Sequence, residues 1–185
     1  MFRARFEYLI RDSEIEACNI TELAFHHLRR LIAVDSDEQK KWMIAFGVGE
    51  TACEKLGAVH LLAHRIWAFK VKGSHAETDL VFGETENLEP TQIRRIVRAM
   101  VLTEWKVVRD PAQTERKAAE ARKETDEYQA GVLGDLELKR TRYIVLVGER
   151  RLRPPADVEQ NGVVYRHIWI PVDPERPSKA ARRKG

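Results

Sequence analysis

Apolar residues recur at helical spacing along the first third of the chain. Over residues 13–34 they fall mostly three or four positions apart, which predicts a helix there. Asp35-Ser36-Asp37 is typical of a helix start, and a second helix is expected over residues 38–46. Gly47-Val48-Gly49 ends that helix, and residues 50–64 predict a third one. The apolar stripe expected on the third helix consists of Ala52, Cys53, Leu56, Val59, His60 and Ala63.

The pattern changes to that of β-strands after residue 64. Three strands are predicted from short aromatic or aliphatic runs, at residues 65–71, 78–82 and 100–108. A short basic helix is expected at residues 91–99, between the second and third of these strands. Residues 112–132 return to helical spacing. The apolar run 143–147 predicts a strand buried on both faces, and residues 163–172 alternate as a last strand.

This order of elements predicts the fold class. It indicates an α/β or α+β domain in which a central mixed sheet is flanked by helices, with a helical region at the N-terminus. A length of 185 residues favours one domain. Residues 1–48 are expected to form the helical region packed on the core, residues 49–173 the α/β core, and residues 174–185 a basic, flexible tail.

Composition excludes several classes of protein. Apolar residues make up 43% of the chain and charged residues 33%, which favours a globular protein over a disordered one. No run approaches the roughly 18 apolar residues of a membrane span, and no secretory signal is recognisable. Two cysteines without a Cys-x-x-Cys pair exclude a disulfide scaffold and a thiolate zinc site. We therefore expect a cytoplasmic protein without a membrane partner.

The basic net charge is concentrated at the C-terminus. The chain carries +3 in all, and residues 176–184 hold five positive charges and no negative one. Without those five charges the rest of the chain is near −2. The tail is either an electrostatic contact for an anionic partner or a solubilising terminus.

The triplet Glu104-Trp105-Lys106 lies in the predicted third strand. Residues two apart on a strand point to the same face, so Glu104 and Lys106 project together and Trp105 projects to the other side. Valine and leucine flank the triplet, which predicts that both charges are partly buried and need a partner or a metal. The alternative is an exposed ion pair on an edge strand.

Asp79 precedes the apolar run of the predicted second strand. If that strand is a neighbour of the third, Asp79 and Glu104 converge, and two close carboxylates repel unless a cation lies between them. Carboxylate oxygens suit Mg²⁺, which polarises a phosphoryl oxygen and lowers the pKa of a bound water. Lys106 can orient that water and stabilise charge on the phosphoryl group. This combination favours phosphodiester hydrolysis.

These residues resemble the PD-(D/E)XK nuclease superfamily. An Asp that opens one strand, Glu-x-Lys on the next, then a helix and an apolar strand are similar to its pattern over residues 50–148. The resemblance implies a restriction-endonuclease-like core of helix, three-stranded meander, helix and strand. It also implies that Asp79 and Glu104 bind Mg²⁺ or Mn²⁺ and that Lys106 is a catalytic lysine. Thr78 stands where the name has Pro, and the connection before Glu104 is long.

The resemblance suggests accessory residues on two helices. Glu124 and Tyr128 are four apart on the long helix, where some recombination-type members carry Gln and Tyr. The favoured alternative is an ordinary helix pair with Tyr128 in the core. Members often present an acid from an upstream helix, for which Glu50 and Glu54 are candidates, although a solvated helix face is favoured for both. For His60, a core histidine with a satisfied partner is favoured over a metal ligand.

A basic cluster is expected on the short helix over residues 91–99. Arg94, Arg95 and Arg98 are spaced so that they can contact nucleic-acid phosphates near the site. The alternative is that they serve solubility. The basic residues that flank the 143–147 strand favour a nucleic-acid cleft in the same way, although solvated loops have the same composition.

The leading hypothesis is a metal-dependent nuclease that hydrolyses phosphodiester bonds in DNA. A homodimer is expected, because a small nuclease must cut two strands. The alternative is a chain that keeps the nuclease fold but acts as a nucleic-acid-binding or interaction subunit without cleavage. A third reading is a helical regulator with an incidental charged triplet, in which Asp79 and Glu104 lie far apart.

Overall fold

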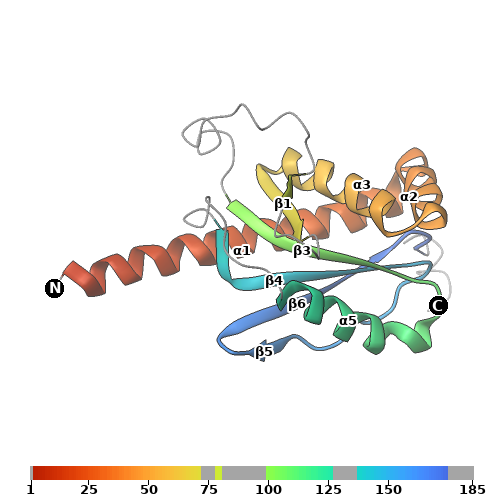
Figure 1. Ribbon diagram of the computed structural model, residues 1–185. Coiled ribbons are helices and arrows are strands. Elements are labelled where there is room, and N and C mark those ends of the chain that lie inside the picture. Colours follow the sequence, from red (N-terminus) through yellow and green to blue (C-terminus); the bar gives the residue numbers. More distant parts are fainter. Residues whose placement is uncertain (1, 72–77, 81–98, 127–136, 175–185) are drawn as a thin grey trace, which may run out of the picture.

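The computed structural model describes residues 2–71, 78–80, 99–126 and 137–174 (Figure 1). Three helices come first: α1 (Phe2–Val34), α2 (Ser36–Val48) and α3 (Glu50–Ala63). The three predicted helices are therefore confirmed, although α1 begins at Phe2 and not at residue 13 as expected. Asp35 is the N-cap of α2, and its carboxylate accepts hydrogen bonds from the backbone N–H groups of Asp37 at 2.8 Å and Glu38 at 3.1 Å. Gly49, with φ +138°, separates α2 from α3.

The rest of the described chain forms one sheet with a single α-helix. Its six strands are β1 (Ile66–Val71), β2 (Thr78–Leu80), β3 (Ala99–Val108), β4 (Glu137–Gly148), β5 (Val158–Gln160) and β6 (Val163–Pro171). A short 3-10 turn, η2 (Pro111–Gln113), precedes helix α5 (Thr114–Asp126), which lies between β3 and β4 in the sequence. The mixed α/β class predicted from the sequence is confirmed.

The strand order is β2-β1-β3-β4-β6-β5. Neighbours among β1, β3, β4 and β6 pair in parallel, whereas β2 and β5 pair antiparallel at the two edges. The meander expected over the first three strands is wrong in its order. β1 pairs with β3 from Ile66↔Ala99 to Phe69↔Leu102, and β2 pairs with the other side of β1. β2 and β3 are therefore not neighbours.

Helices cover both faces of the sheet, and each face has its own apolar core. Figure 1 shows α1, α2 and α3 on one side of the sheet and α5 on the other. The larger core joins Phe25 of α1 and Trp42 of α2 to Trp105 of β3. The smaller core lies under α5 and includes Ile144 and Trp169. All ten residues of β3 are buried.

The buried side of α3 differs from the predicted stripe. Val59 is 57% exposed, whereas Gly57, Ala58 and Leu61 are buried. The cause is a close approach to the sheet: a Cβ at Gly57 would lie 2.1 Å from Cη2 of Trp105. The helix presents its smallest residue to the largest side chain of β3, which a count of apolar positions does not reveal. None of the described helices is long and apolar enough to cross a membrane.

Candidate active site

The second half of β3 has different partners on its two sides. On one side, β4 pairs with β3 as far as Val108↔Gly148. On the other side, the ladder with β1 ends at Phe69↔Leu102. The N-terminus of α3 reaches this side of β3, where the backbone N–H of Val107 donates to Oε1 of Glu50 at 3.4 Å. The carboxyl end of β3 is therefore lined by a helix terminus rather than by a continuous strand.

Glu104 and Lys106 are buried at this end of β3. Glu104 is 1% exposed and Lys106 is 4% exposed, and Lys106 Nζ lies 3.3 Å from Oε1 of Glu104. Trp105, between them, belongs to the core on the opposite face. The predicted arrangement of the triplet is confirmed, and the alternative of an exposed ion pair is wrong. Two buried charges are expensive to desolvate, so their presence here calls for compensating partners.

Those partners are two further carboxylates that converge on Lys106. Its ammonium donates to both oxygens of Glu124 on α5, each at 2.8 Å. Oε2 of Glu50, at the start of α3, lies 3.8 Å away. Three elements that are distant in sequence thus bring three carboxylates around one lysine. The cluster carries an excess of negative charge, which favours an additional cation.

The cluster keeps Lys106 protonated. Burial by itself lowers the pKa of this lysine. The hydrogen bond to Glu124 and the charges of Glu104, Glu50 and Glu124 outweigh that effect, so the pKa is raised above its ordinary value. At neutral pH the side chain is therefore an ammonium. It can stabilise negative charge and orient a hydrogen-bond acceptor, but it cannot act as a general base.

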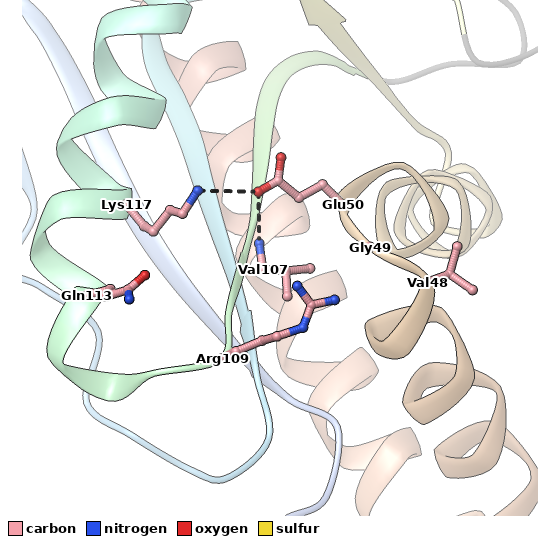
Figure 2. Close-up of a pocket in the computed structure, with 7 residues that line it drawn as sticks. All are labelled: Val48, Gly49, Glu50, Val107, Arg109, Gln113 and Lys117. Carbon is pink, nitrogen blue, oxygen red and sulfur yellow. Dashed lines mark hydrogen bonds and ion pairs between the residues drawn. The ribbon is translucent and has the colours of Figure 1, made fainter.

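A pocket of about 510 Å³ opens beside the cluster (Figure 2). Glu50 lines it, with Lys117 Nζ of α5 3.8 Å from Oε1 of its carboxylate. Arg109, directly after β3, donates to the backbone carbonyls of Phe46 and Gly47, each at 3.3 Å. Two cationic side chains thus line a pocket next to the three carboxylates, an arrangement suited to a polyanionic ligand.

The sequence reasoning missed Arg109 and Lys117. Lys117 lies seven positions before Glu124 on α5, so both residues share one face of the helix. This spacing could have placed Lys117 beside the predicted site. Arg109 follows β3 directly, three residues after Lys106. Its contact with the end of α2 could have been predicted only if the structure of the turn after β3 were known.

Several predicted site residues have clear outcomes. Glu50 was expected to lie on a solvated face, which is wrong, because it contacts β3, Lys106 and Lys117. Glu54, for which the same was expected, is buried. The approach of the α3 N-terminus to the end of β3 explains the contacts of Glu50, and the rotated buried side of α3 explains the burial of Glu54. Glu124 contacts Lys106, and its accessory role stays a prediction.

The expectation for Asp79 is only partly tested. Its strand, β2, pairs with β1 and is separated from β3 by that strand, so the expected neighbouring strands are wrong. Two interstrand spacings, roughly 9.6 Å, lie between the backbones of β2 and β3. The structure describes the backbone of Asp79 but not its side chain, so its role as a metal ligand stays a prediction. Four other predicted residues lie outside the described ranges: Tyr128, Arg94, Arg95 and Arg98.

The donor set fits a hard divalent cation. Glu50, Glu104 and Glu124 offer only carboxylate oxygens, and Mg²⁺ is commonly held by one or two carboxylates with water completing its shell. The carboxylates surround Lys106 rather than forming one compact group. Among the described residues, the group of three whose ligand atoms all lie within 4.8 Å of one another is instead His27, His60 and His64.

No protein-family model matches the chain, and comparisons with curated proteins and with solved structures found no match. The function of the site is therefore argued from its own geometry and charge, because a fold class alone does not define an activity.

Proposed function

We propose that this protein is a metal-dependent nuclease that hydrolyses phosphodiester bonds. The supporting observation is the buried Glu104–Lys106 pair, with Glu50 and Glu124 converging on the same ammonium. The site lies toward the carboxyl end of a parallel strand, where α/β sheets commonly bind ligands. Three carboxylates that converge on a buried, protonated lysine form a site suited to metal-assisted phosphoryl chemistry.

Each group has a role in this proposal. Glu104 and Glu50 would hold Mg²⁺ or Mn²⁺, with Asp79 as a further predicted ligand. The bound ion would act as a Lewis acid and lower the pKa of a water molecule. Lys106 stabilises the charge that develops on the phosphoryl oxygens, and Glu124 holds the lysine in position.

The proposed substrate is DNA, and the proposed assembly is a homodimer. The pocket beside the cluster supports an anionic substrate, because Arg109 and Lys117 line it and can contact phosphates. The order α3, β1, β3, α5 and β4 resembles a restriction-endonuclease-like core, and membership of the PD-(D/E)XK superfamily is part of the proposal. The edge position of β2 is a departure from that core.

A nucleic-acid-binding protein without cleavage is the second candidate. The observation that favours it is the position of Lys106, which occupies the space among the carboxylates and already neutralises part of their charge. If the lysine remains there when metal is offered, the pocket can bind phosphates but the site cannot hydrolyse them. Both candidate functions use the pocket. They differ in whether Glu104 binds a metal ion or only pairs with Lys106.

A nicking assay on supercoiled plasmid separates the two. We expect the parent to cut with Mg²⁺ or Mn²⁺ and to stop when EDTA is added. Glu104→Gln removes a ligand charge with little change in volume, so both cleavage and calorimetric Mn²⁺ binding should be lost. Lys106→Met should bind Mn²⁺ at least as well as the parent, because a competing cation has gone, yet cut about 100- to 1,000-fold more slowly.

The matched control is Glu159→Gln, which changes an exposed carboxylate on β5. This strand is at the edge of the sheet, and β4 and β6 separate it from β3. The variant should cut and bind like the parent. Salt-dependent DNA binding without nicking would support the second candidate. Nicking that survives Glu104→Gln would show that this cluster is not the active site.

A further inference from the structure

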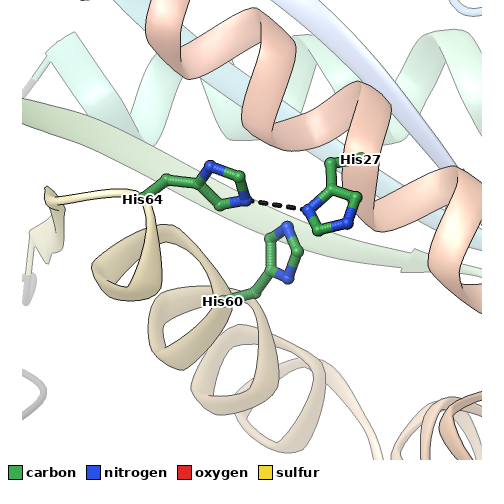
Figure 3. A group of neighbouring side chains, drawn as sticks. All are labelled: His27, His60 and His64. Carbon is green, nitrogen blue, oxygen red and sulfur yellow. Dashed lines mark hydrogen bonds between the residues drawn. The ribbon is translucent and has the colours of Figure 1, made fainter.

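Three histidines meet where α1 crosses the C-terminal end of α3 (Figure 3). Nδ1 of His27 lies 2.9 Å from Nε2 of His64, and ligand nitrogens of His27, His60 and His64 all fall within 4.8 Å of one another. The three ring centroids are 5.0–5.3 Å apart. Figure 3 shows the rings turned toward a common space rather than stacked in a row. This histidine cluster shares no residue with the carboxylate site on β3.

The two helices are built to bring these residues together. His60 lies on α3 and His64 is the C-cap residue of that helix, four positions later, so the two side chains lie one above the other on the same side of the helix end. His27 comes from α1, and Nε2 of His60 lies 3.0 Å from the carbonyl oxygen of Ala24, one turn earlier on that helix. The contact between the helices is thus already fixed by the fold. The sequence analysis favoured a core histidine for His60, but the residue is half-buried and beside two further imidazoles.

The surroundings of His60 and His64 favour the neutral imidazole, which is the form that binds metal. Desolvation and then the neighbouring imidazoles hold the pKa of His60 below its ordinary value, against the hydrogen bond to Ala24. Desolvation and His27 do the same for His64. A neutral imidazole can move its single N–H to the ring nitrogen that faces away. All three facing nitrogens can then coordinate without a net loss of protons.

We propose that His27, His60 and His64 bind a divalent transition-metal ion, of which Zn²⁺ is the best match. Imidazole nitrogen suits Zn²⁺, which is held at about 2.0–2.1 Å in a tetrahedral shell. That geometry places two ligand nitrogens about 3.3 Å apart, so His27 and His64 need to separate only slightly from their present contact. His60 approaches by a side-chain rotation, and one position stays open for water.

The site has a structural consequence, because its ligands come from two helices. α1 packs over the sheet, and α3 carries Glu50 at its opposite end. A metal shared by His27 on α1 and the pair on α3 clamps the helices together. The ion binds the folded chain only, since the unfolded chain does not hold the three histidines in this arrangement. Binding therefore stabilises the fold by mass action.

The experiment is a Zn²⁺ titration of the full chain, produced without a polyhistidine tag and first stripped with a chelator. We expect one high-affinity Zn²⁺ site per chain by calorimetry, tighter than any binding at the carboxylate cluster, and a visible absorption band of tetrahedral type with Co²⁺. At a hundredfold excess over Kd, Tm should rise by about 5–10 °C. His60→Asn and His64→Asn should weaken Zn²⁺ binding by more than the roughly 10- to 100-fold that follows loss of a supporting hydrogen bond.

Two controls make the result specific. His26→Asn changes the exposed histidine beside His27 on α1 and should bind Zn²⁺ like the parent. Glu104→Gln should also keep Zn²⁺ binding, which separates this site from the carboxylate cluster. Circular dichroism of the metal-free variants confirms that each is folded. Zn²⁺ binding that is equal in His60→Asn, His64→Asn and the parent, or equally lost in His26→Asn, overturns the proposal.

Discussion

The two faces of β3 differ although both are buried. One face carries Trp105 and Val107, which pack into the large core under α1, α2 and α3. The other carries Glu104 and Lys106, which pair with each other, and Lys106 also binds Glu124 of α5. Burial of the apolar face stabilises the fold, whereas burial of the charged face is costly unless the charges are well paired. A strand that retains two charges under a helix therefore indicates a function more strongly than it indicates stability.

The aromatic face also has its polar groups satisfied locally. Nε1 of Trp105 donates to Oγ1 of Thr103, two residues earlier on the same face, at 3.2 Å. Its rings lie against Trp42 at 6.2 Å and Phe25 at 6.3 Å between centroids. This face is complete as it stands. The charged face, by contrast, has two ammonium groups, Lys106 and Lys117, for three carboxylates and an adjoining pocket. It keeps a net negative charge and is suited to a further cation.

The largest effect is expected from Trp105→Ala. Removal of a fully buried indole leaves a cavity between three helices and the sheet, which should lower the free energy of unfolding by about 3–5 kcal/mol. Urea unfolding followed by circular dichroism measures the loss. Leu152→Ala, at a partly exposed position, is the control and should change it by less than about 0.5 kcal/mol. A loss below 1 kcal/mol for Trp105→Ala would contradict the role of this face as the main core.

Lys106→Met tests the charged face. The substitution removes the ammonium and leaves Glu104 buried beside Glu50 and Glu124, so stability at neutral pH should fall by about 3 kcal/mol. That is the low end for a broken buried pair, because the other two carboxylates can turn toward solvent. In the variant, burial and like charges raise the pKa of Glu104 in the folded state. Stability should therefore increase as pH falls through that raised pKa, because the folded chain takes up the proton first.

The double variant Glu104→Gln with Lys106→Met sharpens this test. It removes both buried charges and should recover most of the loss at neutral pH, with the pH dependence largely gone. Urea unfolding at neutral and mildly acidic pH measures both quantities. If Lys106→Met is as stable as the parent at neutral pH, the carboxylates do not depend on the lysine, and the faces differ less than their contacts indicate.

Local patterns predicted the helices and most strands. Helical spacing, the Asp35 cap and the Gly49 break defined α2, α3 and most of α1, and apolar runs defined β1, β3, β6 and the second half of β4. The strand order could not be predicted in the same way. Whether β2 pairs with β1 or β3 depends on the path of the connections, and hydrophobic periodicity contains no information about that path.

The candidate site was predictable to the extent that it lies on one strand. Period two places Glu104 and Lys106 together, and the flanking valines indicate burial. Glu50 could not be assigned from its own helix, because its contacts arise where the start of α3 meets the end of β3. The histidine cluster was missed for the same reason, since His27 and the pair on α3 are neighbours only after α1 crosses α3.

The smallest expected effect, from Gly57→Ala, examines how closely the aromatic face is packed. Alanine favours a helix over glycine by about 0.5–1 kcal/mol, so the substitution would stabilise an open position. Here the new Cβ would lie 2.1 Å from Cη2 and 2.2 Å from Cζ2 of Trp105, a rigid ring held in place by its aromatic neighbours. The clash should outweigh the helical preference and leave a net loss of about 1–3 kcal/mol.

The matched control is Gly47→Ala in α2, where a Cβ would meet nothing within 4 Å. It should be neutral or slightly stabilising. The double variant Gly57→Ala with Trp105→Phe should lose less stability than the sum of the losses of the two single variants, because the smaller ring makes room for the new methyl group. Strict additivity in this cycle, measured by urea unfolding, would show that α3 does not rest on Trp105. The tight packing of the aromatic face would then have to come from α1 and α2 alone.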